Sequence, residues 1–272
     1  MPELDLEQVL RDLPRPSFKR RLRESMQSQT VTPYITTRDV DAVVGFARDG
    51  FAAEEVLRMA GEAGGIHCEI RIGDSKVMIG GGNTLTAPPM PTMLHVYVRD
   101  VDALHRRALE AGGKELAPPR DQAYGDRDSV VEDAAGNQWC IATSKGGAYK
   151  PEALRDVTLY LHPSGVPDLL RFTEAAFGGE TLERYDAPDG TVAHAKVRFG
   201  NSVVEMGEAH GQWAPMPTMI FFSVADADAA YARAMAAGAR SIMAPKNQPY
   251  GRTGAVEDPA GNQWYMAGPV RT

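Results

Sequence analysis

The sequence contains one long segment twice. Residues 90–143 begin MPTMLHVYVRDVDALHRRALEAG and end VVEDAAGNQWCIAT, and residues 216–268 begin MPTMIFFSVADADAAYARAMAAG and end AVEDPAGNQWYMAG. About half of the aligned positions are identical, far more than a shared composition produces. The separation of the copies is too long for a solenoid repeat, so the pattern indicates a duplicated domain.

Composition excludes several classes of protein. A chain of 272 residues with 43% apolar content is long enough for two domains with real cores. The net charge of −7 argues against nucleic acid as a partner, because such proteins carry a basic face. No apolar run is long enough to cross a bilayer, and the polar N-terminus is not a signal peptide. Two cysteines fit a reducing compartment, so we expect a cytoplasmic protein without membrane or nucleic-acid partners.

The repeat sets the expected domain boundaries. We predict a helical arm at residues 1–29, a first domain at 30–145, a linker at 146–152 and a second domain at 153–272. The arm lies outside the duplication and carries a short basic helix. It is a candidate contact with a domain or with a second copy of the chain in a homodimer.

Each copy has the pattern of a strand, a helix and three strands, repeated once. Asp39, Asp100 and Asp226 precede helical segments as N-caps, and Gly50 is expected to end the first helix. The sequence therefore predicts an α+β fold of four βαβββ units, with two units pairing into a cup-shaped mixed sheet in each domain.

The strings HVYVRDVDA, QAYGDR and EDAAGNQW, with QPYGR and EDPAGNQW in the second copy, resemble the vicinal oxygen chelate superfamily, the glyoxalase/bleomycin-resistance fold, in its PhnB-like branch. The resemblance implies tandem glyoxalase-like domains, each with a ligand cup. It does not choose a function, because the superfamily contains isomerases, lyases, dioxygenases, thiol transferases and non-catalytic drug-binding proteins.

The resemblance also implies where a metal would be held. In metal-dependent members the ligands come from the first and last strands of each unit, and those positions here are Thr32, Met78, Met93, Cys140, Thr158, Glu205, Met219 and Tyr265. Only Glu205 is a good ligand for a hard divalent metal, and one carboxylate does not hold an ion. We therefore expect no cofactor. A divalent metal held by His162, His194 and Glu205 is the alternative.

Strand alternation predicts the residues that line the cups. His67 and His194 are the candidate catalytic acid/base residues, each four residues before an arginine. The candidate ligand-binding residues are Tyr34, Arg71, His95 and Tyr97 in the first cup and Tyr160, His162, Arg198, Glu205, Phe221 and Tyr265 in the second. The alternative is that the same side chains are ordinary polar residues of a half-exposed sheet.

Three functions follow from these residues. The favoured one is a protein that binds a small organic, oxygen-rich or natural-product-like ligand in a metal-free cup. The first alternative is a lyase, isomerase or cyclase that uses histidine acid/base chemistry or the metal set above. The second is a non-catalytic scaffold whose cups are filled by neighbouring side chains.

Overall fold

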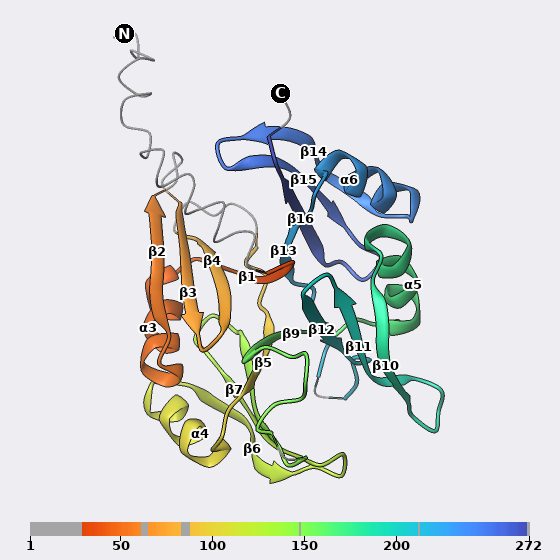
Figure 1. The fold of residues 1–272 in the computed structure, drawn as a ribbon. Coiled ribbons are helices and arrows are strands. Elements are labelled where there is room, and N and C mark those ends of the chain that lie inside the picture. Colours follow the sequence, from red (N-terminus) through yellow and green to blue (C-terminus); the bar gives the residue numbers. More distant parts are fainter. Residues whose placement is uncertain (1–28, 61–64, 83–87, 147, 212, 271–272) are drawn as a thin grey trace, which may run out of the picture.

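The computed structural model describes residues 29–60, 65–82, 88–146, 148–211 and 213–270. Within this part of the chain, the strands form two mixed sheets of eight strands each, with the helices packed against them (Figure 1). This confirms the predicted α+β class. Residues 1–28 of the predicted N-terminal arm lie outside the described residues.

Four βαβββ units follow one another along the chain. The first contains β1 (Val31–Thr37), α3 (Val40–Phe51), β2 (Glu54–Ala60), β3 (Ile66–Ile72) and β4 (Ser75–Gly81). The second contains β5 (Met93–Tyr97), α4 (Val101–Glu110), β6 (Lys114–Asp121), β7 (Asp126–Glu132) and β8 (Gln138–Ser144). The third contains β9 (Val157–Leu161), α5 (Val166–Phe177), β10 (Glu180–Asp186), β11 (Val192–Phe199) and β12 (Ser202–Met206). The fourth contains β13 (Met219–Ser223), α6 (Ala227–Ala236), β14 (Arg240–Gln248), β15 (Gly251–Glu257) and β16 (Gln263–Gly268).

Local sequence signals fix the helix starts. Asp39, Asp100 and Asp226 are the N-caps of α3, α4 and α6, and each side chain accepts a hydrogen bond from a backbone N–H of the first turn. The end of α3 differs from the prediction, because the helix continues through Gly50 and ends at Ala52, which has a φ of 56°. Gly50 lies inside the helix and faces α4, where an added Cβ would be in ordinary contact with Ala108, 3.5 Å from its Cα. The left-handed residue that ends α3 is Ala52.

Each sequence copy builds one hydrophobic core. The core of the first copy lies around α3 and α4 and includes Phe46, Leu94 and Trp139, whereas that of the second includes Phe199 and Trp264. Both tryptophans are fully buried and stack among phenylalanines. The two units of one copy therefore meet through their helices and apolar sheet faces.

The sheets, in contrast, are shared between the copies. In one sheet the strand order is β14-β15-β16-β13-β1-β4-β3-β2, so the first unit continues into the fourth through antiparallel pairing of β1 with β13. In the other the order is β10-β11-β12-β9-β5-β8-β7-β6, and β5 pairs with β9. We call the faces of these two sheets that are turned away from the helices cup A and cup B, respectively.

This pairing corrects the expected cups. The prediction placed Tyr34 with His95 and Tyr97, but Tyr34 lies in cup A and the other two lie in cup B. The physical reason is that the helices of one copy fill the space between its units. The first strand of each unit consequently has a free edge, and it finds its partner in the other copy.

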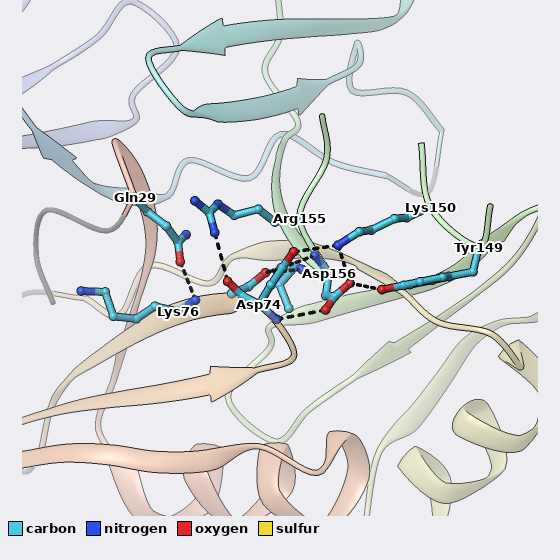
Figure 2. A network of polar contacts seen from close by, with 9 residues as sticks. Gln29, Asp74, Lys76, Tyr149, Lys150, Arg155 and Asp156 are labelled. Carbon is cyan, nitrogen blue, oxygen red and sulfur yellow. Dashed lines mark hydrogen bonds and ion pairs between the residues drawn. The ribbon is translucent and has the colours of Figure 1, made fainter. Parts of the chain in front are cut away.

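A polar network joins the copies beside this seam (Figure 2). The backbone N–H of Asp74, at the β3–β4 turn, donates to the carboxylate of Asp156, and the N–H of Asp156 donates to the carboxylate of Asp74, at 3.0 and 2.8 Å. Lys150 Nζ lies 2.7 Å from both carboxylates and balances their charge. Gly73 has a φ of +55°, and a side chain there would collide with Asp156, so the turn requires glycine. These hydrogen bonds and ion pairs hold the linker against the first unit.

None of the helices in the described ranges is both long and apolar enough to span a membrane.

Candidate functional site

Cup A contains a cavity of about 440 Å³. Most of its wall is aromatic or sulfur-containing, and strands of both copies contribute to it. The lining residues are Tyr34, Thr36, Met59, Ala60, His67, Glu69, Met78, Gly80, Gly81, Met219, Phe221, Tyr250, Thr253 and Tyr265. A cavity of this size with a few polar groups in an apolar wall is typical of small-molecule sites.

The polar groups of cup A form one connected cluster. Glu69 is 1% exposed, and its carboxylate oxygens lie 3.6 Å from His67 Nε2 and 3.6 Å from Lys76 Nζ. The hydroxyl of Tyr34 lies 3.1 Å from His67 Nδ1. Burial lowers the pKa of Lys76, and the neighbouring Glu69 opposes that shift. Cup A therefore combines an apolar wall with a buried carboxylate.

The predicted alternation along β3 and β4 is confirmed. His67, Glu69 and Met78 face the cavity, while Cys68 and Ile70 are packed into the core under α3. The arginines do not join the cups as expected. Arg71 pairs with Glu54 on β2, and Arg198 pairs with Glu180 on β10, both as exposed ion pairs. Each arginine lies on its strand beyond the residues that face the cup.

Cup B holds a buried cluster of charge. His95 Nδ1 lies 2.8 Å from one carboxylate oxygen of Glu205, and His194 Nε2 lies 3.4 Å from the other. The Tyr97 hydroxyl donates to Glu205 at 3.4 Å. Burial alone would lower the pKa of His95, but Cys140 and Glu205 together raise it well above its usual value. Burial would raise the pKa of Glu205, but the histidines hold it well below its usual value.

These two shifts predict how stability depends on pH. A raised pKa of His95 stabilises the fold fully below 6.5, the pKa of the unfolded residue, and this contribution declines as the pH rises through the folded value. The lowered pKa of Glu205 stabilises the fold above pH 4.5, and this contribution is lost as the pH falls.

We expect the difference in unfolding free energy between the wild type and His95→Gln to be largest between pH 4.5 and pH 6.5 and to decrease above pH 6.5. The decrease should approach about 1.4 kcal/mol per pH unit at most. Urea unfolding at pH 5.5 to 8.5 measures it, and a difference that does not change with pH would contradict the assigned ion pair.

The alternative metal set is not brought together. His194 and Glu205 meet, but His162 stacks on Trp213 with ring centroids 6.3 Å apart, and burial beside His210 lowers its pKa to about 4. Across the described ranges, no group of three or more His, Cys, Asp or Glu side chains is arranged to hold a metal ion. At the family's ligand positions, cup A has Thr32, Met78, Met219 and Tyr265. The side chains of these cups do not fit the metal of the family's enzymes.

The apolar part of cup B is covered by the segment that connects β12 to β13. Trp213 and Met216 pack against the buried cluster of Met93, Val130 and Cys140. The backbone N–H of Met216 also donates to the carbonyl of His162 at 3.0 Å. Charged groups therefore line cup B and Trp213 and Met216 cover its apolar part, whereas the described residues of cup A surround an apolar cavity.

The structure divides the predicted site residues into three sets. Tyr34, His67, Phe221 and Tyr265 lie in cup A. His95, Tyr97, Tyr160, His162, His194 and Glu205 lie in cup B or at its rim. Arg71 and Arg198 lie outside both. Catalysis by His67 or His194 stays a prediction.

Alternation along β3 places Glu69 on the cup face beside His67, as in the structure, although the candidate ligand-binding residues above do not include it. They also do not include Met59 or Tyr250. Tyr250 lines cup A from the fourth unit, so only the pairing of β1 with β13 reveals it.

Comparison with known proteins agrees with this architecture. The profile of the glyoxalase/bleomycin resistance protein/dioxygenase superfamily matches residues 28–141 and 164–266. The chain belongs to this superfamily and carries its domain in tandem.

Similar proteins include an uncharacterized protein of Mycobacterium bovis and one of Mycobacterium tuberculosis. Each is 33% identical over 122 residues, which cover 41% of this chain and 80% and 72% of the respective relatives. Glyoxalase I from Zea mays superposes with a TM-score of 0.67 and 14% identity, over 90% of this chain and 95% of its own. A putative dioxygenase from Bacillus subtilis has a TM-score of 0.59 and 12% identity, over 87% and 84%. At these identities the likeness to the solved structures shows the fold alone.

Proposed function

We propose that this protein binds a small aromatic molecule in cup A without a metal. The observation that carries the proposal is the cavity of about 440 Å³, which has aromatic and methionine walls and a buried carboxylate. The volume suits a ligand of one to three fused or linked rings. The corresponding face of cup B is covered by Trp213 and Met216, so the two cups have different roles.

The lining supports a specific ligand chemistry. Tyr34, Phe221 and Tyr265 offer faces and edges for ring stacking, and methionine sulfur packs well against aromatic rings. Glu69 supplies acceptor oxygens at the polar end of the cavity, so the ligand is expected to carry a hydroxyl or N–H donor. Phenols and related hydroxylated aromatic natural products have this combination.

Calorimetric titration with 2-naphthol tests the proposal. We expect binding to the wild type, and weaker binding of 2-methoxynaphthalene, because the ether cannot donate to Glu69. Tyr250→Ala should weaken the binding of 2-naphthol by roughly tenfold, the loss of one aromatic wall. Tyr124 is its counterpart in the first copy, outside cup A and 70% exposed, so Tyr124→Ala is the matched control.

Two outcomes would contradict the proposal. One is that neither aromatic compound binds to the wild-type protein. The other is that Tyr124→Ala weakens binding as much as Tyr250→Ala does.

We also infer that the chain falls in the PhnB-like branch and acts in the cytoplasm. The strings QAYGDR and EDAAGNQW support the branch. Both cysteines are free thiols in the structure, which supports a reducing compartment.

A further inference from the structure

Thr253 is a buried polar residue in the wall of cup A. It lies on β15 and is 1% exposed, and its Oγ1 has no partner at hydrogen-bond geometry among the described residues. Tyr250 is its neighbour: burial raises the pKa of Tyr250, and Thr253 opposes that rise. In folded proteins the large majority of buried hydroxyls are hydrogen-bonded. A hydroxyl without a bond, on a residue that lines a cavity, therefore indicates a place for a polar atom of a ligand.

The corresponding position of the first copy is used differently. Alignment of the segments that end in EDPAGNQW and EDAAGNQW places Thr253 opposite Asp128. The Asp128 carboxylate accepts hydrogen bonds from Gln122 Nε2, at 2.6 Å, and from the hydroxyl of Tyr124, so it holds the loop of its own copy. The second copy repeats the glutamine and the tyrosine of this loop but has a neutral hydroxyl in place of the carboxylate. Thr253 is thus not committed to the loop as Asp128 is.

Thr253 and Glu69 reach cup A from opposite sides of the sheet. Thr253 is on β15 and Glu69 on β3, and the strands β16, β13, β1 and β4 lie between them (Figure 1). Neighbouring strands are about 4.8 Å apart, so residues this far apart in the sheet line one cavity only from facing walls. The strands between them contribute Tyr265, Phe221 and Met78. The cavity therefore has aromatic and methionine side chains between two polar groups.

We propose that the ligand of cup A is an aromatic diol, with one hydroxyl bound by Glu69 and a second, at the opposite end of the ring system, bound by Thr253. This inference rests on the proposed function, because it takes an aromatic ring system to occupy the cavity. A carboxylate only accepts hydrogen bonds, whereas a threonine hydroxyl both donates and accepts, so each suits a ligand hydroxyl. A ligand with a single hydroxyl at Glu69 leaves Thr253 unsatisfied, and a diol satisfies both. Thr253 is then a specificity-determining residue.

Calorimetric titration of the full chain with three naphthalene compounds tests the inference. 2-Naphthol has one hydroxyl, 2,6-dihydroxynaphthalene has hydroxyls at opposite ends, and 2,3-dihydroxynaphthalene has both at one end. We expect the 2,6-isomer to bind roughly tenfold more tightly than 2-naphthol, because its second hydroxyl satisfies a buried group. The 2,3-isomer should gain less. The inference is overturned if the 2,6-isomer gains no more than the statistical factor of its two equivalent orientations, or no more than the 2,3-isomer.

Two substitutions of Thr253 separate its hydroxyl from the shape of the wall. Thr253→Val replaces the hydroxyl with a methyl group of similar size and removes a buried polar group, so the variant is expected to fold. The advantage of the 2,6-isomer over 2-naphthol should fall to the statistical factor in Thr253→Val and remain in Thr253→Ser. Thr181→Val, at an exposed position on β10 of the other sheet, is the matched control and should keep the advantage. An advantage that persists in Thr253→Val would contradict the role of the hydroxyl.

Failure of this inference differs from failure of the proposed function. If 2-naphthol binds and the 2,6-isomer has no advantage, the two-ended ligand is wrong and the aromatic site in cup A stands. If none of the three compounds binds to the wild-type protein, both are wrong.

Discussion

Replacing Glu205 with alanine should destabilise the folded protein by about 3–5 kcal/mol. The carboxylate is 1% exposed and contacts His95 and His194, so its removal leaves buried, charged or polar groups without their partner. The penalty of desolvating His95 is then no longer offset by an opposite charge. Urea unfolding followed by tryptophan fluorescence measures the loss.

The control for Glu205 is Glu180→Ala. Glu180 lies on β10 of the same sheet and pairs with Arg198 at 3.2 Å, and the side chains of this pair are 64% and 43% exposed, respectively. A solvent-screened pair of this kind contributes at most about 1 kcal/mol. If the two variants lose similar stability, the buried cluster of cup B is not the electrostatic centre described above.

Replacing Asp258 with alanine should cost about 3 kcal/mol or more, because several buried donors would lose their acceptor. Its carboxylate accepts hydrogen bonds from the backbone N–H groups of Ala260 and Asn262, at 2.9 Å each. It also accepts one from the Asn262 side chain at 2.9 Å and one from the indole N–H of Trp264 at 2.8 Å. One residue thereby closes the β15–β16 turn and orients the largest side chain of the second core.

Glu257→Ala, at the neighbouring position, is the control for Asp258. Glu257 pairs with Arg240, whose side chain is 70% exposed, so the substitution should cost less than about 1 kcal/mol. Chemical denaturation of both variants gives the comparison. A cost for Asp258→Ala no greater than that of its neighbour would show that the turn forms without the carboxylate.

Asp133 has the same contacts in the first copy, including the indole of Trp139. This explains why the string EDxAGNQW occurs in both copies. The aspartate, asparagine and tryptophan of the string act together to build the last hairpin of each copy. Their repetition reflects folding rather than ligand binding.

The sequence was sufficient for the parts of the fold that local physics decides. The caps at Asp39, Asp100 and Asp226 and the alternation on β3 and β4 could be predicted because each depends on residues close in the chain. The end of α3 could not, because the left-handed position that ends the helix is occupied by Ala52 rather than by a glycine.

The same local patterns could not predict which residues share a cup. A repeat shows that two units belong together in sequence, but it does not show which free strand edges pair. The contact between His95 and Glu205 joins residues far apart in the chain and depends on the pairing of β5 with β9. His95 and Phe221 occupy corresponding positions of the two copies, and the role of each depends on its neighbours from the other copy.

The cavity proposed to bind a small aromatic ligand lies in cup A, whereas Trp213 and Met216 cover the apolar part of cup B. Methionine methyl groups report on both, because Met59, Met78 and Met219 line the cavity of cup A, whereas Met216 belongs to the cover of cup B and Met93 lies beneath it. NMR spectra of the protein labelled with ¹³C at its methionine methyl groups, recorded during a titration with 2-naphthol, separate the two. Ligand binding in cup A should give saturable shifts at the three cup A methionines and leave the signals of the two cup B methionines unchanged. Shifts confined to Met93 and Met216, or no saturable shift at any of the five, would contradict it.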